Sequence, residues 1–141
     1  MDESGTIQVR HIAGEQFEIS TRQHRFRIDQ PVPDGGEDSA PTPVELFVSS
    51  LAACVGVYAR RFLVRHDLAT EGLSVEADYS ISTRPVRVEE IAIRLHSPDG
   101  VPDAKLPALL AVASHCTVHN TLQSLPKISI DLVPAKNALV V

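Results

Sequence analysis

The 141-residue sequence contains no tryptophan, and aromatic residues make up only 4% of it. A hydrophobic core must therefore be built from aliphatic side chains, which are available because hydrophobic residues account for 43% of the chain. Basic residues are also scarce, since 13 lysines and arginines stand against 18 aspartates and glutamates. The net charge of −5, with no basic cluster, argues against a protein that binds nucleic-acid backbones.

Three further patterns are missing. The N-terminus carries Asp2 and Glu3 in place of the basic and apolar segments of a signal peptide. Ser49 and Ser50 interrupt the longest apolar stretch, so we expect no membrane span and a cytoplasmic protein. Gly35-Gly36 is too short for a glycine-rich phosphate loop, and we expect no cofactor.

The length of the chain predicts a single domain over residues 1–141. Alternating apolar residues predict strands at 6–12, 16–19, 24–28, 73–81, 86–95 and 128–132. The alternation slips at Glu89-Glu90, which indicates a β-bulge. The segment 31–41 is rich in proline and glycine and is predicted to be a long loop.

A helix is predicted from residue 42 to about Arg65. Thr42 and Glu45 form a capping box around Pro43, which is favoured at the first helical position. Residues 46–59 are apolar or small on almost every face, which is typical of a helix buried on all sides. Because a small domain cannot easily cover such a helix, we expect a second subunit to cover part of it.

The only two cysteines, Cys54 and Cys116, both lie in segments of helical character. Cys116 closes an apolar run in a second predicted helix, which begins near residue 102 or 103 and runs toward Cys116, with a short helical extension to about Gln123. A permanent disulfide is not expected in a reducing cytoplasm, which leaves inert packing, metal binding or redox chemistry. Ser50, one helical turn before Cys54, and His115, beside Cys116, favour reactive thiols.

Zinc binding is a weaker alternative. His115, Cys116 and His119 could supply ligands together with Cys54. The Cys-x-x-Cys pairs of structural zinc sites are absent, however, and neighbouring His115 and Cys116 would point in different directions on a helix, so we expect no metal. Glu45 lies nine residues before Cys54, on nearly the opposite face of the helix, which favours capping over catalysis.

Several motifs, in this order and spacing, resemble the OsmC/Ohr family. They are Asp29-Gln30-Pro31 leading to Gly35-Gly36, then APTPVELF at 40–47, SLAAC at 50–54 and HCTVHNTL at 115–122. The resemblance implies an α+β fold in an intertwined homodimer, with curved antiparallel sheets packed around two long central helices. It also implies two active sites at the subunit interface.

The same resemblance implies a thiol-dependent peroxidase that reduces organic hydroperoxides in the oxidative stress response. Cys54 matches the peroxidatic position and Cys116 the resolving position, so that the two would form a disulfide during turnover. A thiol reductant, such as a dihydrolipoyl group, would reduce this disulfide. The alternatives are a small-ligand-binding module with incidentally reactive thiols and, third, a zinc-binding protein.

The chain departs from the best-characterised branch of this family near both cysteines. In that branch a Glu directly follows the helix-initiating Pro and pairs with an Arg that activates the peroxidatic thiol, whereas Val44 occupies this position here. Thr117 stands where Pro is common after the second cysteine. The groups considered for activating or supporting Cys54 are Arg25, His24, Glu45 and His115.

Overall fold

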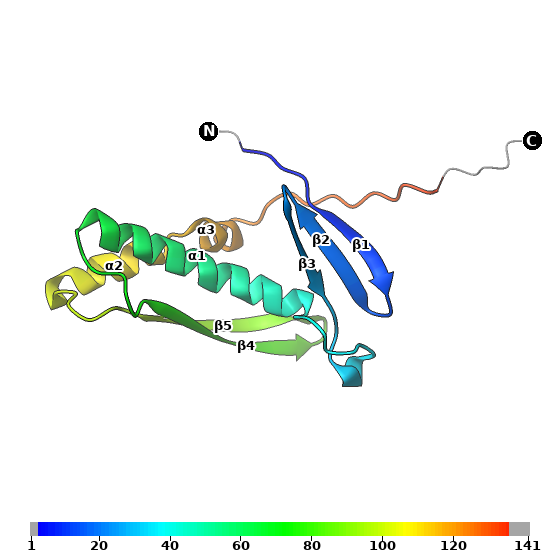
Figure 1. Ribbon diagram of the computed structural model, residues 1–141, viewed down its shortest axis with the longest axis horizontal. Coiled ribbons are helices and arrows are strands. Elements are labelled where there is room, and N and C mark those ends of the chain that lie inside the picture. The colour runs from blue at the N-terminus through cyan, green and yellow to red at the C-terminus, as the bar shows by residue number, and fades with distance from the viewer. Residues whose placement is uncertain (1–2, 136–141) are drawn as a thin grey trace, which may run out of the picture.

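The computed structural model describes residues 3–135 and has a mixed α+β architecture with two antiparallel sheets and three α-helices, which confirms the expected fold class. Figure 1 shows the three helices on one face of a long hairpin, while the first three strands form a separate sheet beside the start of the longest helix. The elements in chain order are β1 (Gln8–Ala13), β2 (Gln16–Thr21), β3 (His24–Ile28), the 3₁₀ turn η1 (Val32–Asp34), α1 (Pro43–Arg65), β4 (Ser74–Thr83), β5 (Val86–His96), the 3₁₀ turn η2 (Asp103–Lys105), α2 (Leu106–Ala113) and α3 (Thr117–Gln123).

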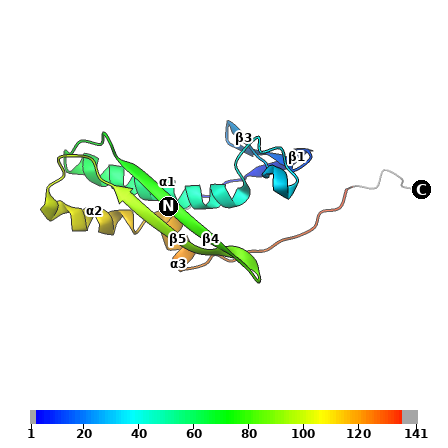
Figure 2. The ribbon, with the colours of Figure 1, turned by 90° about the horizontal axis from the view of Figure 1, so that it is seen from below.

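The β4–β5 hairpin forms the floor on which the helices pack. Ser80 pairs with Glu90 and the next residue, Ile81, pairs with Val88, so Glu89 is the extra residue of the expected β-bulge. On the inner face, Val75 of β4 and three apolar residues of β5 pack against the buried cluster. Figure 2, seen from below, shows the hairpin crossing in front of the helices.

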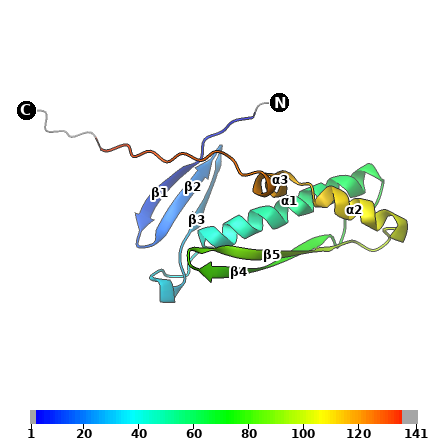
Figure 3. The ribbon, with the colours of Figure 1, turned by 180° about the vertical axis from the view of Figure 1, so that it is seen from behind.

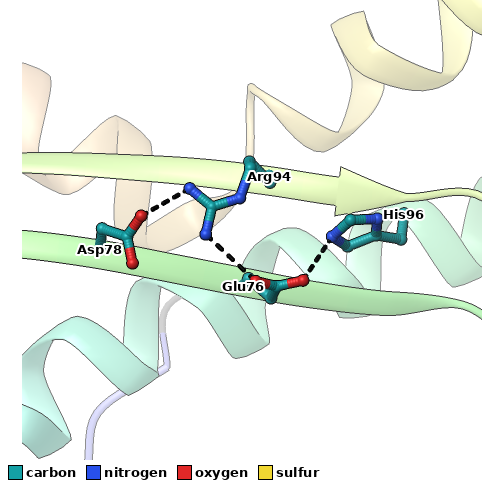
Figure 4. Close-up of polar contacts among 4 residues, drawn as sticks. All are labelled: Glu76, Asp78, Arg94 and His96. Carbon is teal, nitrogen blue, oxygen red and sulfur yellow. Dashed lines mark hydrogen bonds and ion pairs between the residues drawn. The ribbon is translucent and has the colours of Figure 1, made fainter.

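The outer face of the hairpin carries a cluster of charged side chains, drawn in Figure 4. The Arg94 guanidinium donates hydrogen bonds to Glu76 (3.1 Å) and Asp78 (2.6 Å), and His96 Nε2 lies 2.7 Å from Glu76. Hydrogen bonds from Arg94 lower the pKa of both carboxyl groups. These residues alternate with the inward-facing apolar ones, so the cluster belongs to the exposed face of the sheet, away from the helices.

The α1 helix begins with the predicted capping box. Thr42 Oγ1 accepts a hydrogen bond from the Glu45 N–H (3.1 Å), and Glu45 Oε1 accepts one from the Thr42 N–H (2.9 Å). These two bonds satisfy backbone donors that helix geometry leaves free. Glu45 is therefore engaged in starting the helix.

Within this single chain, α1 is buried along one stripe only. Phe47, Val57 and Val64 expose 39%, 46% and 50% of their surface, and burial of the helix on all sides would require the expected second subunit. By length and apolar composition, α1 is the one helix in residues 3–135 that could span a membrane, although core helices pass the same test. The residues of the buried stripe are Val48, Leu51, Val55, Ala59, Phe62 and Leu63.

In the second half of the chain, the helix toward Cys116 and the extension to Gln123 are confirmed as α2 and α3, but two expectations were wrong. Cys116 lies between these helices, as the N-cap of α3, and not inside a helical segment. The alternating segment 128–132 forms no strand with any described residue, and Ile130 and Leu132 expose 93% and 90% of their surface. An alternating pattern becomes a strand only where a neighbouring backbone is available to pair with it.

Asp29, immediately after β3, organises the long loop that leads to α1. Its Oδ2 accepts hydrogen bonds from the N–H groups of Glu37 (3.2 Å) and Ser39 (3.0 Å) and from the Ser39 hydroxyl (2.7 Å). Its Oδ1 accepts from the Gln30 N–H (2.8 Å), and its own N–H donates to the Pro41 carbonyl (3.1 Å). The fully buried carboxylate thus folds the loop around itself.

Gly36 fills the narrowest place in this loop. A Cβ atom there would overlap the Gln30 carbonyl and lie 2.7 Å from Asp29 Oδ1, so no side chain fits without moving backbone. The Asp29-Gln30-Pro31 and Gly35-Gly36 motifs therefore shape the loop that precedes α1.

We predict that Asp29→Asn lowers the melting temperature at neutral pH. The variant should also lose less of its stability than the wild type when the pH is lowered. The hydrogen bonds to Asp29, first that of the Ser39 hydroxyl, lower its pKa from 3.8 to about 2. The folded protein then binds fewer protons than the unfolded chain, so this stabilisation is complete above about pH 4 and is lost as the pH falls through about 2. Circular dichroism melts across this range should show a lower melting temperature and a shallower acid response in the variant.

Asp34→Asn is the matched control, because Asp34 lies exposed in the same loop. It should leave both the melting temperature and its pH dependence unchanged. If Asp29→Asn melts like the wild type at every pH, the organising role of this carboxylate is wrong.

Candidate thiol site

Cys54 lies near the middle of α1, one helical turn before Tyr58. Its side chain is half-buried and packs against the buried core cluster that includes Cys116. The helix supplies it with mainly apolar neighbours, Val55 on the core face and Ala53 on the exposed side. A thiol at this position is partly accessible and fixed to a rigid element.

Cys116 occupies the junction between α2 and α3 and has no exposed surface. It is the N-cap residue of α3, and its Sγ accepts a hydrogen bond from the His119 N–H (3.4 Å). Burial raises the pKa of the Cys116 thiol, and the neighbouring Cys54 raises it further. Cys116 therefore remains protonated at a pH where a typical exposed thiol begins to ionise.

The fold brings together two cysteines that are 62 positions apart in the sequence. Cys54 comes from α1 and Cys116 from the start of α3; both are free thiols, and Cys54 packs against the buried cluster that contains Cys116. Figure 3 shows α3 beside the middle of α1, and the two helices are in contact. One accessible thiol next to one buried, protonated thiol can form a disulfide when the first is oxidised.

The other residues considered from the sequence have different partners. His115 Nδ1 lies 2.6 Å from the Ala111 carbonyl, so this histidine closes the end of α2. His24 and Arg25 lie exposed on β3, and no hydrogen bond or ion pair among residues 3–135 joins either of them to a cysteine. Ser50 donates its hydroxyl hydrogen to the Phe47 carbonyl (2.7 Å). Their roles toward Cys54 remain predictions.

Sequence reasoning missed one polar contact at this site. The Tyr58 hydroxyl and Thr117 Oγ1 are 2.7 Å apart and link α1 to the first residue of α3. The available signals were the spacing of four residues between Cys54 and Tyr58 and the threonine that follows Cys116 directly. Neither signal reveals that the two helices meet at these residues.

Metal binding receives no support from the geometry. Within residues 3–135, no three histidine, cysteine, aspartate or glutamate side chains converge as metal ligands would. His115 bonds to its own helix, and His119 approaches Cys116 through its backbone N–H. The zinc alternative therefore ranks below thiol chemistry.

An apolar cavity of about 270 Å³ adjoins the same core, between α1, β5 and the α2–α3 junction. Leu51 and Val55 of α1 form one wall, and Ala113 and His119 lie on the side of Cys116. Most of its lining residues are apolar, so it can accept a small organic group, and Ser114 and His119 add a polar edge. Neither Cys54 nor Cys116 is among the lining residues.

Comparison with known proteins agrees with this architecture. Residues 36–131 match the family described as OsmC-like protein.

Solved structures of similar proteins share the fold. An osmotic stress induced and detoxification response protein from Psychrobacter arcticus has TM-score 0.77, 20% identity, and coverage of 86% of this chain and 90% of that one. An OsmC-like protein from Mycoplasma pneumoniae has TM-score 0.70 and 23% identity, with coverage of 89% of this chain and 91% of that one. An organic hydroperoxide resistance protein from Legionella pneumophila has TM-score 0.63 and 22% identity, with coverage of 87% of this chain and 93% of that one.

The fold, with one cysteine in α1 and the other at the N-cap of α3, defines a protein of the OsmC/Ohr class. The chain belongs to the OsmC-like protein family, because the family match covers most of its length. No curated protein matches it in sequence, and the similar solved structures establish the fold alone at these identities.

We predict that thiol reagents modify Cys54 at least about ten times faster than Cys116 in the folded, reduced protein. Cys54 is partly accessible, whereas Cys116 is buried and its raised pKa lowers its thiolate fraction. A short pulse of N-ethylmaleimide followed by peptide mass spectrometry should find the label on Cys54.

Unfolding in denaturant provides the control, because it should make both cysteines react. Cys54→Ser should abolish the fast labelling, while Cys116→Ser should retain it. Equal labelling of the two cysteines in the folded protein would contradict the buried position of Cys116.

Proposed function

We propose that this protein is a two-cysteine, thiol-dependent peroxidase that reduces organic hydroperoxides. The observation that carries the proposal is the packing of a partly accessible Cys54 against the apolar core cluster that contains the buried Cys116. Membership of the OsmC-like family supports it, as does the shared fold with an organic hydroperoxide resistance protein from Legionella pneumophila.

Each of the two thiols acts as the nucleophile in one step of the reaction. The Cys54 thiolate attacks the terminal oxygen of the hydroperoxide, the O–O bond breaks, and an alcohol leaves after protonation. Cys54 is then a sulfenic acid. The Cys116 sulfur attacks the Cys54 sulfur, the S–O bond breaks, and water leaves as the disulfide forms. A dithiol reductant, such as a dihydrolipoyl group, restores both thiols and becomes a disulfide itself.

The apolar surroundings favour an organic hydroperoxide over hydrogen peroxide. The cavity of about 270 Å³ beside Leu51 and Val55, which Cys54 itself does not line, has room for a small alkyl or aryl group. Burying this group adds binding energy that hydrogen peroxide cannot supply. The thiol cycle needs a reducing compartment, which supports a cytoplasmic location.

A homodimer is the second part of the proposal. The apolar stripe formed by Phe47, Val57 and Val64 is uncovered on α1, and the alternating segment 128–132 has no partner in the described chain. A second copy would cover the stripe and offer a backbone for the segment to pair with. In such a dimer, Arg25 or His24 of one copy could contact Cys54 of the other.

We predict that one equivalent of cumene hydroperoxide converts the reduced protein to a Cys54–Cys116 disulfide. Peptide mass spectrometry without reductant should find the bridge, because Cys54 packs against the core cluster that contains Cys116. Cys54→Ser should lose all peroxide consumption, and Cys116→Ser should stop at an oxidised Cys54. Two unmodified thiols after long exposure would favour the binding-module alternative.

The same oxidation assay tests the activating residue. Arg25→Ala should slow the first step by at least about tenfold if Arg25 stabilises the Cys54 thiolate. Arg10→Ala is the matched control, since Arg10 lies in the same sheet and pairs with Glu18. An unchanged rate in Arg25→Ala would remove Arg25 from the mechanism and leave the cysteine chemistry intact.

We predict that the protein is a dimer and that Val57→Glu separates it into monomers. A buried, unpaired carboxylate at the centre of the α1 stripe would cost several kcal/mol, about enough to dissociate a typical interface. Size-exclusion chromatography with light scattering measures the mass. Val32→Glu, at an exposed valine in the loop before α1, should remain dimeric. A monomeric wild type would overturn the proposed dimer.

A further inference from the structure

A single hydroxyl pair connects the two segments that carry the cysteines. Tyr58 Oη and Thr117 Oγ1 lie 2.7 Å apart, and either oxygen can be the donor. Among residues 3–135 this is the one side-chain hydrogen bond between α1 and α3. Each partner is close in sequence to a thiol, since Tyr58 is one turn after Cys54 and Thr117 follows Cys116 directly.

Tyr58 is held on the α1 side of this contact. Its half-buried ring packs against the core cluster, and the Arg61 guanidinium lies over it, 5.2 Å from the ring centre. A side chain fixed in this way presents its hydroxyl in one direction. The hydroxyl is therefore a rigid anchor for α3.

The α3 side needs such an anchor. The helix has seven residues, Thr117–Gln123, and so short a helix is not stable without tertiary contacts. Val118 and Leu122 pack against the core, while Thr117, at its first turn, is exposed apart from its bond to Tyr58. The position of that first turn determines where Cys116 stands, because Cys116 is its N-cap residue.

We propose that Tyr58 and Thr117 are positioning residues that hold Cys116 against Cys54 for disulfide formation. The inference rests on the proposed function for the oxidant that acts on Cys54. In the step concerned, a sulfur–sulfur bond forms, the S–O bond of the Cys54 sulfenic acid breaks, and the hydroxyl leaves as water with the proton of the Cys116 thiol. Neither Tyr58 nor Thr117 exchanges atoms with the reacting groups.

Position matters at this step because the sulfenic acid has two fates. It can condense with Cys116, or it can meet a second hydroperoxide molecule and become a sulfinic acid. The first fate depends on the effective concentration of the Cys116 sulfur, which falls when the start of α3 is free to move. The hydroxyl pair should therefore control the partition between disulfide and sulfinic acid.

Tyr58→Phe tests the proposal with little change in packing, since the ring and its contact with Arg61 remain. Under excess cumene hydroperoxide, we expect the ratio of disulfide to sulfinic acid to fall by about twofold to tenfold, the range that one hydrogen bond supports. Intact-protein mass spectrometry measures this ratio. The rate of first oxidation at Cys54 should not change, which separates positioning from activation.

Variants at Thr117 provide the matched series. Thr117→Val removes the hydroxyl from a side chain of the same shape and should match Tyr58→Phe, while Thr117→Ser should restore the wild-type ratio. The double variant should lose no more than either single variant, because both remove the same bond. Tyr79→Phe makes the same chemical change on β4, away from α3, and should behave as wild type.

A peroxide-free measurement separates this inference from the proposed function. Equilibration in dithiothreitol buffers of increasing oxidised fraction gives the stability of the Cys54–Cys116 bridge, which reports the same effective concentration. Tyr58→Phe should weaken the bridge by a similar factor. Failure of the wild type to react with peroxide would overturn the proposed function alone. Unchanged bridge stability in both Tyr58→Phe and Thr117→Val would overturn the positioning role alone.

Discussion

The structure depends on the buried stripe of α1, against which the hairpin and the other two helices all pack. The same helix face must cover the inner side of the β4–β5 hairpin and receive α2 and α3. Burial of aliphatic side chains such as Leu63 and Leu109 drives this arrangement, because aromatic residues are scarce. The approach of α3 to α1 then places Cys116 in the core beside Cys54. The thiol pair is thus a consequence of core packing, and the hydroxyl bond from Tyr58 refines it.

A second constraint acts at the other end of α1. The carboxylate of Asp29 replaces water around the backbone N–H groups of the loop, which lets the chain turn tightly between β3 and the helix. Gly36 is required there because the loop passes too close to Gln30 for a side chain. The polar motif therefore positions the start of α1, and it lies apart from Cys54 in the middle of the helix.

Local features were predictable because nearby residues determine them. The capping box of Thr42 and Glu45, the strands of the hairpin and the extra residue Glu89 were all confirmed, since each depends on neighbours in sequence or on the alternation of side chains. The end of the second helix and the strand at 128–132 were not. The first depends on how Cys116 caps α3, and the second requires a backbone partner that the described chain does not supply.

By itself, the sequence determined most of the elements, the resemblance to the family and the identity of the two thiols, because periodicity, caps and short motifs are local properties. Only the tertiary structure decided that Cys54 is partly accessible while Cys116 is buried, and that both belong to one core. It also decided that Asp29 is buried within a loop and that Tyr58 reaches Thr117. The physical reason is the same in each case: burial and contact depend on how helices and loops pack across long sequence separations, which no local pattern encodes.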